Sequence, residues 1–235
     1  MARLGDVCTV VSGTTPKSNH SEYWNGDLNW VTPAELTDES DTIYETQRKI
    51  TSQAVVDSSL KSFPAGTVLL SSRAPIGKVA ISGTEMYCNQ GFKNLICSEK
   101  IYNRYLYYFL KNKTAYLNSL GRGATFKEIS KSIVENIEIP LPSIEEQQKI
   151  AAVLDKVSDL IAKRRQQLDK LDELVKSRFI EMFGDPERNL KGLPVLPWHE
   201  VFHTTTGKLD SNAMVEGGQY PFVPCGKENY WSDTY

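Results

Sequence analysis

The amino-acid sequence predicts a mixed α/β domain followed by a long, coiled-coil-forming α-helix. Over residues 1–142, short β-branched runs are bounded by Gly, Pro, Asn and Ser, which is typical of strands and turns. Over residues 143–183, apolar side chains recur at alternating spacings of four and three, the heptad pattern of a coiled coil. A chain of 235 residues has room for one large domain or two small ones.

The first 142 residues contain both kinds of secondary structure. Strands are predicted over residues 7–12, 67–71, 78–82 and 94–97. A helix is predicted over residues 103–120, where aromatic side chains follow helical spacing and Gly121 provides a C-terminal stop. Tyrosines in and beside this helix could stack on nucleic-acid bases, but we favour an amphipathic helix that packs on a sheet.

The second part, residues 143–183, begins with a helix-capping signature. Ser143 is a good N-cap, and Glu146 three residues later would complete a capping box. At about 1.5 Å per residue, the helix would be about 60 Å long. One helix cannot bury its own apolar seam, so we expect a partner helix from this chain or from another copy. The seam residues are Ile150, Leu154, Val157, Ile161, Leu168, Leu171, Val175 and Met182.

The third part, residues 184–235, contains a repeat of the first domain's opening. Residues 198–207 (WHEVFHTTTG) align with residues 4–13 (LGDVCTVVSG) at an offset of 194, which predicts that a second copy begins near Leu196. The 235-residue chain ends too soon afterwards for a complete copy. We therefore interpret residues 184–235 as a linker and the incomplete start of a second domain, in a fragment or in a reading frame that ends early.

The same repeat contains a zinc-protease pattern. Residues 199–203 read HEVFH and fit H-E-x-x-H, which needs both histidines on one face of a helix. Pro197 before the motif and threonines after it favour a strand instead. The aligned positions in the first copy, Gly5 and Thr9, could not bind zinc. We expect no metal site, and a metalloenzyme remains the least favoured alternative.

The net charge of −2 conceals a basic half-domain. Residues 71–131 carry ten basic and three acidic side chains, a net charge of +7, whereas residues 22–57 carry a net charge of −6. Basic residues that gather on one face can bind phosphates even when the whole chain is nearly neutral. An ordinary solvated surface is the alternative interpretation.

Other features of the composition restrict the class of protein. The longest apolar run has six residues, far short of the roughly 20 in a membrane-spanning helix, and the N-terminus resembles no signal peptide. The cysteines form no C-x-x-C pair, which argues for a reducing cytoplasm. P-loop and dinucleotide-binding motifs are missing, and no nucleophile–base pair is evident, so we expect a binding protein without catalytic residues.

Several short motifs together resemble a known family. They are GTTPK at residues 13–17, EYWNG at 22–26, NWV at 29–31, SRAPIG at 72–77, NQGF at 89–92, GAT at 123–125 and IPLPSIEEQ at 139–147. Their order and spacing resemble the DNA-specificity subunit of type I restriction–modification enzymes. The resemblance covers residues 1–183 well and the remainder weakly, as the opening of a second recognition domain.

The resemblance implies an architecture and a set of partners. It implies a target-recognition domain over residues 1–142, a conserved spacer helix over 143–183 and the start of a second recognition domain over 184–235. Each recognition domain would read one half of a bipartite site on double-stranded DNA. The chain would catalyse nothing and bind no cofactor, because S-adenosylmethionine and ATP would bind to the modification subunits and the restriction (translocase) subunit. Two copies that form a homodimer through the spacer helix would restore the missing half.

Candidate DNA-binding residues follow from these motifs and from the basic half-domain. Asn89 and Gln90 could pair with an adenine edge, and Tyr23 and Trp24 could pack against the sugar–phosphate backbone or a thymine methyl. Turn formation is the alternative for the two amides, and core packing is favoured for the two aromatic residues. Thr125 belongs to the last recognition-domain motif. The candidates for contacts with phosphates or guanine edges are Lys17, Arg73, Lys78, Lys93, Arg122 and Lys127.

A second class of function stays open from the sequence alone. The long helix could serve as a coiled-coil scaffold, or the chain could be an inactive decoy that binds modification subunits without reading DNA. Sequence-selective, salt-dependent DNA binding would favour the recognition subunit over this alternative.

Overall fold

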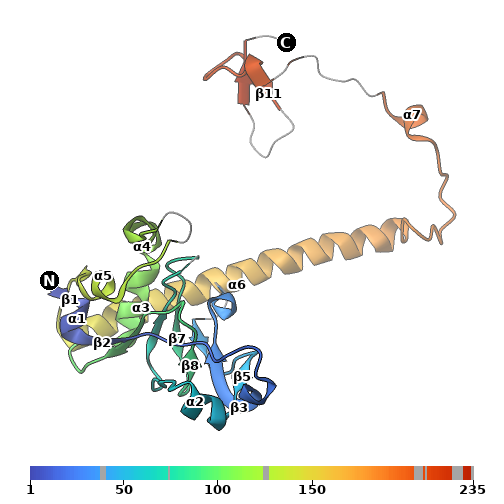
Figure 1. The fold of residues 1–235 in the computed structure, drawn as a ribbon. Coiled ribbons are helices and arrows are strands. Elements are labelled where there is room, and N and C mark those ends of the chain that lie inside the picture. The colour runs from blue at the N-terminus through green and yellow to red at the C-terminus, as the bar shows by residue number, and fades with distance from the viewer. Residues whose placement is uncertain are drawn as a thin grey trace. The chain divides into compact units, whose positions relative to one another are not determined.

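The structure is a computed structural model that contains two compact units, Met1–Gln167 and Leu168–Tyr235. Helix α6 (Ile144–Phe183) begins in the first unit and continues into the second (Figure 1). None of the described helices is both long enough and apolar enough to cross a membrane. The structure describes residues 1–37, 41–73, 75–123, 127–203, 209, 211–223 and 230–233.

The first unit is built on a five-stranded sheet in the order β2-β9-β6-β7-β4. Neighbouring strands are antiparallel except for β4 and β7, which are parallel. Every residue of β6 and β7 is buried, because both faces of the sheet are covered. The strands are β2 (Cys8–Val11), β9 (Asn94–Cys97), β6 (Val68–Leu70), β7 (Val79–Ser82) and β4 (Thr42–Ile43).

Helices cover one face of this sheet. Val68 and Leu70 of β6 point into a large core that also contains Leu106 of α3 and Leu117 of α4. Leu69, between them, points to the other face and a smaller core. Strand β1 (Ala2–Arg3) pairs with β10 (Glu138–Ile139) beside these helices. The helices are α1 (Leu4–Val7), α3 (Asn103–Lys111), α4 (Thr114–Leu120) and α5 (Lys131–Glu135).

A second, three-stranded sheet has the order β5-β3-β8. Strand β3 is antiparallel to β5 and parallel to β8. Its core is formed by Trp30, Ile50 and Ala54 among others. The elements are β3 (Trp24–Val31), β5 (Lys49–Ile50), β8 (Tyr87–Cys88), α2 (Ser52–Asp57), and the short 3-10 helices η1 (Ser21–Tyr23) and η2 (Pro33–Glu35).

Helix α6 confirms the predicted long helix of residues 143–183 to within one residue. The Glu146 backbone N–H donates to Ser143 Oγ at 3.3 Å, so Ser143 is the N-cap. Gln147 and Ala151, in the first two turns, are buried against the domain. From Lys156 to Phe183, every residue is exposed. The helix therefore packs on its own domain only through its first turns.

One predicted helix was wrong in its extent, and the strands predicted over residues 7–12, 67–71 and 78–82 are shorter by one residue at one or both ends. The single helix predicted over residues 103–120 is two helices, because the backbone leaves the helical path at Lys113 (φ −104°, ψ 13°). The break lets α4 pack against a turn of the sheet, where Asn118 Nδ2 donates to the Ile76 carbonyl at 3.0 Å. The strand predicted over residues 7–12 begins at Cys8, because Leu4–Val7 forms the one-turn helix α1. Gly121 is the C-cap, as predicted.

The part of the second unit that follows α6 repeats the opening of the first domain in its local structure. Helix α7 (Trp198–Val201) is a single turn that leads into an extended Phe202, as α1 leads into an extended Cys8 at the predicted offset of 194. The strand prediction over HEVFH was therefore wrong. The remaining elements are η3 (Ser211–Ala213) and the antiparallel pair β11 (Tyr220–Phe222) and β12 (Tyr230–Ser232).

The zinc-protease pattern does not adopt the geometry that its chemistry needs. His199 lies in the four-residue α7, whereas His203 follows the helix beyond the extended Phe202. The two imidazoles therefore do not share a helix face. Over the described residues, no three His, Cys, Asp or Glu side chains are grouped so that they could hold a metal ion.

Candidate nucleic-acid interface

Residues of the GTTPK and NQGF motifs lie directly against each other. A Cβ atom on Gly13 would lie 2.0 Å from the Cys88 carbonyl oxygen, so only glycine permits this approach. The Thr14 backbone N–H donates to the same carbonyl at 3.0 Å. The Thr15 hydroxyl donates to Gln90 Oε1. Two motifs that are about 75 residues apart in sequence thus form one contact.

The SRAPIG motif and the segment around residue 128 extend this arrangement. The Ser72 N–H donates to the Gly91 carbonyl at 2.7 Å, and the Ile129 N–H donates to the Ser72 carbonyl at 2.9 Å. Arg122 and Glu128 exchange backbone hydrogen bonds of 3.0 and 2.9 Å. Four loops are therefore linked one to the next. We call the described residues of 13–17, 72–77, 89–92 and 122–129 the four-loop cluster.

Glu128 is the charged centre of the four-loop cluster. Its Oε1 accepts from Lys93 Nζ at 3.1 Å, and its Oε2 accepts from Arg73 Nε at 3.0 Å. The Lys93 side chain is only 8% exposed, so its ammonium group needs this carboxylate. Partial burial alone would raise the pKa of Glu128, but Lys93 and Arg73 outweigh it and hold the pKa below its usual range.

We expect Glu128→Gln to lower the free energy of unfolding by about 1–2 kcal/mol near neutral pH, a value reduced for solvent screening. Because the folded-state pKa of Glu128 is lowered, its stabilisation is complete above the ordinary glutamate pKa and is lost as the pH falls through the lowered value. Urea unfolding of both proteins at about pH 7 and about pH 3 measures this difference.

The matched control is Glu99→Gln, because Glu99 is an exposed glutamate in a turn. It should unfold at the wild-type urea concentration at both pH values. A deficit of Glu128→Gln that stayed equally large at low pH would contradict an electrostatic origin.

The predicted basic residues fall into two groups, those that are exposed and those whose charged groups are bound by other protein atoms. Lys17, Arg122 and Lys127 are exposed. Arg73 is exposed but paired with Glu128, and Lys78 Nζ donates to the Leu36 carbonyl at 2.9 Å. The net charge of +7 over residues 71–131 therefore overstates the charge that is free to meet a phosphate.

The predicted amide and hydroxyl candidates also differ in their availability. Asn89 Oδ1 accepts from the Gly91 N–H at 2.9 Å, which is the turn role that the sequence left open. Gln90 is exposed and retains its amide nitrogen for other partners. Thr125 lies outside the described residues.

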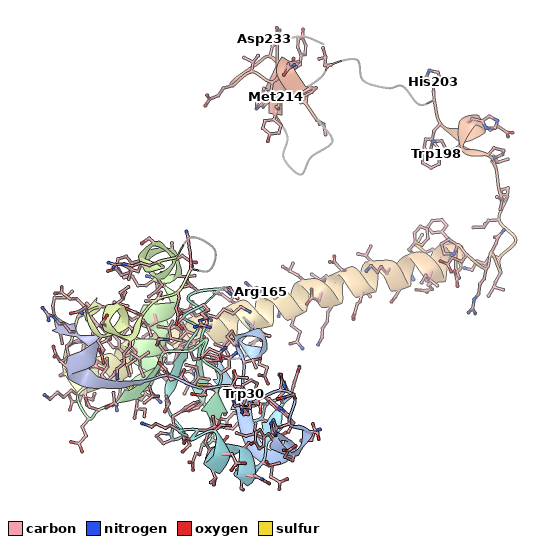
Figure 2. All side chains as sticks on the ribbon, in the orientation of Figure 1. Trp30, Arg165, Trp198, His203, Met214 and Asp233 are labelled. Carbon is pink, nitrogen blue, oxygen red and sulfur yellow. The ribbon has the colours of Figure 1, made fainter. Side chains whose placement is uncertain are left out.

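The two aromatic candidates are packed into the small domain core. Tyr23 is buried, and its hydroxyl donates to Asp57 at 3.0 Å. Trp24 contacts Trp30 edge-on, and the guanidinium of Arg48 lies 3.9 Å from the centroid of the Trp24 ring. Figure 2 shows Trp30 among the crowded side chains of the domain. The contacts of Tyr23 and Trp24 are therefore those of core packing, the interpretation that the sequence favoured.

Sequence reasoning missed three residues that organise this half of the molecule. Glu128 was counted only as one acid among basic residues, although it holds two of the predicted cations. Arg104 and Gln147 tie α3 and the preceding turn to α6. Glu128 and Arg104 belong to none of the short motifs, and Gln147 was noticed only as the last residue of IPLPSIEEQ. Their contacts with Lys93, Asp155 and Tyr102 join residues that are 35, 51 and 45 positions apart along the chain.

The predicted seam of α6 falls into two stretches. Ile150 and Leu154 are partly buried beside Tyr105 and Phe109 of α3, where a groove lies between the two helices. The seam residues beyond Leu154 are exposed, and Figure 2 shows Arg165 projecting from this stretch. The exposed seam residues are Val157 (45%), Ile161 (50%), Leu168 (63%), Leu171 (56%), Val175 (68%) and Met182 (54%).

Comparison with known proteins identifies close relatives. The family model of the type I restriction modification DNA specificity domain matches residues 1–173. The chain is 43% identical over 188 residues to the type I restriction enzyme MjaIX specificity subunit of Methanocaldococcus jannaschii, covering 79% of this chain and 44% of that protein. It is 29% identical over 164 residues to the EcoR124I/EcoR124II specificity subunit of Escherichia coli, covering 67% and 40%.

A solved structure shares the fold. The HsdS subunit from Thermoanaerobacter tengcongensis superposes with a TM-score of 0.56 at 26% identity, and the match covers 71% of this chain and 38% of that one. The chain therefore spans less than half the length of each of these three relatives.

Proposed function

The chain belongs to the family of type I restriction modification DNA specificity domains, and on that premise we propose that it reads one half of a bipartite DNA site for a type I restriction–modification enzyme. The observation that carries this proposal is the four-loop cluster. Four loops that are separate in sequence meet there through backbone hydrogen bonds and the Thr15–Gln90 side-chain contact, and Lys17, Arg122 and Lys127 remain exposed. Cations on loops that are joined by hydrogen bonds can fix the register of a domain on DNA, while Gln90 can pair with a base edge.

The partner subunits are part of this proposal. The chain would be the non-catalytic subunit that directs the complex to its DNA site, and it would bind no cofactor. It would contact double-stranded DNA, the modification subunits and the restriction (translocase) subunit. S-adenosylmethionine and ATP would bind to those other subunits. The exposed seam of α6 supports pairing with a second long helix, since six apolar seam residues would otherwise face water.

Sequencing of the methylated bases in a host that expresses this chain with a cognate modification subunit tests the proposal. We expect one bipartite motif with a constant gap, and a symmetric motif if two copies of the chain pair. A modification subunit that co-purifies with the chain while no motif becomes methylated would favour the scaffold or decoy instead.

Arg122→Ala should weaken DNA binding by the assembled methyltransferase. Arg122 is exposed, and its backbone is held by Glu128, so the loss would be that of the side chain alone. For a phosphate contact, we expect the slope of log affinity against log salt to fall by about one, with an unchanged sequence preference. Fluorescence anisotropy over a range of salt concentrations measures both quantities.

Lys61→Ala provides the control, because Lys61 is exposed and lies outside the four-loop cluster. It should leave both the affinity and the salt slope at the wild-type values. Equal affinities for Arg122→Ala and wild type at every salt concentration would remove Arg122 from the interface.

A further inference from the structure

Polar contacts attach helix α6 to its domain around Gln147 and around Asp155, where Ser158 Oγ also lies 3.3 Å from Tyr108 Oη. The first point is Gln147, which is fully buried in the first turn of the helix. Its Oε1 accepts from the Tyr102 N–H at 2.8 Å, and its Nε2 donates to the carbonyls of Lys100 and Pro142 at 3.1 and 3.0 Å. Gln147 thus uses both ends of its amide to join the helix to the turn before α3.

The second point lies two turns further along the helix, at Asp155. Arg104 Nε of α3 donates to Asp155 Oδ1 at 3.0 Å, and Tyr108 Oη donates to the same oxygen at 2.6 Å. Arg104 Nη2 also donates to Asp41 Oδ2 at 2.6 Å, just before strand β4. Arg104 therefore connects the helix to both α3 and the edge of the five-stranded sheet.

These contacts are partly shielded from water. The side chain of Arg104 is only 21% exposed, so water screens its pairs less than on an open surface. Despite partial burial, which acts in the opposite direction, the two carboxylates raise the pKa of Arg104 and Arg104 lowers the pKa of Asp41. Because two separate points define a line, Gln147 and Asp155 together determine the direction in which α6 leaves the domain.

A small change in that direction has a large consequence at the far end of the helix. Phe183 lies 28 residues after Asp155, which is about 42 Å in an ideal helix. A tilt of roughly 5° about Asp155 would move the end of such a helix by roughly 4 Å. One base pair of DNA occupies about 3.4 Å along the duplex axis. The anchor must therefore be stiff to within a few degrees if the helix is to measure whole base pairs.

We propose that Arg104, with Asp155 and Gln147, fixes the angle between the recognition domain and its spacer helix, and so sets the number of base pairs in the gap of the DNA site. Arg104 is a positioning residue in this role, because it touches the helix and not the DNA. The inference rests on the proposed function for its DNA consequence, but the angle itself is a property of this chain alone.

The test uses Asp155→Lys, which places a second cation against Arg104 at a site that is already 36% exposed. Asp159→Lys makes the same change one turn later, at an exposed aspartate. Asp155→Asn is a milder variant that removes the charge and keeps the shape. Thermal unfolding should show that all three variants fold.

The angle is measured first, without DNA. A ketone-bearing amino acid at Val56 of α2 and another at Lys163 of α6 accept spin labels without involving the native cysteines, and both positions are exposed. Double electron–electron resonance should give one narrow distance in wild type and in Asp159→Lys. In Asp155→Lys, the distance distribution should be shifted or broadened by several ångströms. The distribution in Asp155→Asn should be intermediate between those of wild type and Asp155→Lys. An unchanged distribution in Asp155→Lys would overturn the inference.

The gap is measured second, by methylation sequencing with the modification subunit. Asp155→Lys should keep the wild-type half-site sequences while methylation at the wild-type gap falls at least several-fold and sites with gaps one base pair longer or shorter appear. An unchanged gap would also overturn the inference. A wild-type chain that directs no methylation would defeat the proposed function instead, and the label distances would still decide whether Arg104 sets the angle.

Discussion

Replacing Gly13 with alanine is expected to lower the free energy of unfolding by about 3 kcal/mol, the upper part of the range for overpacking a tight site. The new Cβ would lie 2.0 Å from the Cys88 carbonyl oxygen, 2.4 Å from Cys88 Sγ and 2.5 Å from the Asn89 carbonyl oxygen. Two of these atoms belong to the backbone of strand β8 or the residue after it, so they cannot rotate away. Urea unfolding followed by circular dichroism gives the change directly.

The expected consequence extends to DNA recognition. Relief of the clash would push residues 13–17 away from Gln90 and so break the contact between two motifs of the four-loop cluster. Gly5→Ala is the matched control, since its Cβ would meet mainly the side chain of Glu135, at 3.0 Å. Gly5→Ala should lower the free energy of unfolding by less than about 1 kcal/mol. If Gly13→Ala unfolded at the wild-type urea concentration, this result would contradict the close approach of the two loops.

The second large effect is expected at the seam of α6. Leu171→Lys should convert paired chains into monomers, because it places a charge in the interior of the proposed helix pair, and each burial of a leucine is worth about 1.5–3 kcal/mol. In a symmetric pair the substitution occurs twice, so the dissociation constant should rise by at least about a hundredfold. Sedimentation velocity at micromolar concentration distinguishes the two states.

Ile180→Lys is the control for this experiment. Ile180 is also apolar and exposed, at 51%, but its heptad position lies on the face of the helix opposite the seam. It should leave the pair intact. A wild-type chain that is monomeric at these concentrations would show that α6 needs a different partner helix, and equal effects of both substitutions would place the contact outside the seam.

The expected effects at Gly13 and at Leu171 differ in how far the sequence could anticipate them. The seam was predicted because helical periodicity is a local property, and α6 begins and ends within one residue of the predicted bounds. Strand β9 was likewise predicted to the residue. The glycine of GTTPK was noticed as part of a motif, but its contact with Cys88 depends on a strand about 75 residues away.

The charged residues show the same division. From sequence, Lys93 and Arg104 were counted together with Arg122 as members of one basic half-domain. In the fold, Lys93 is enclosed with Glu128 and Arg104 with Asp41 and Asp155, whereas Arg122 remains exposed. A sum of charges along the chain cannot distinguish these cases, because burial and pairing are set by the three-dimensional neighbours of each side chain.

By itself, the sequence determined the α/β class, the capped spacer helix with its apolar seam, the repeat of the opening segment and the resemblance to a DNA-specificity subunit. All of these depend on periodicity, local capping or motif order, which can be read along the chain without knowledge of tertiary contacts. Only the tertiary structure decided which motifs meet, which cations are free for DNA and how α6 is anchored. Those properties depend on contacts such as Lys93 with Glu128 and Arg104 with Asp155, whose partners are 35 and 51 residues apart and are brought together only when the sheet and helices pack.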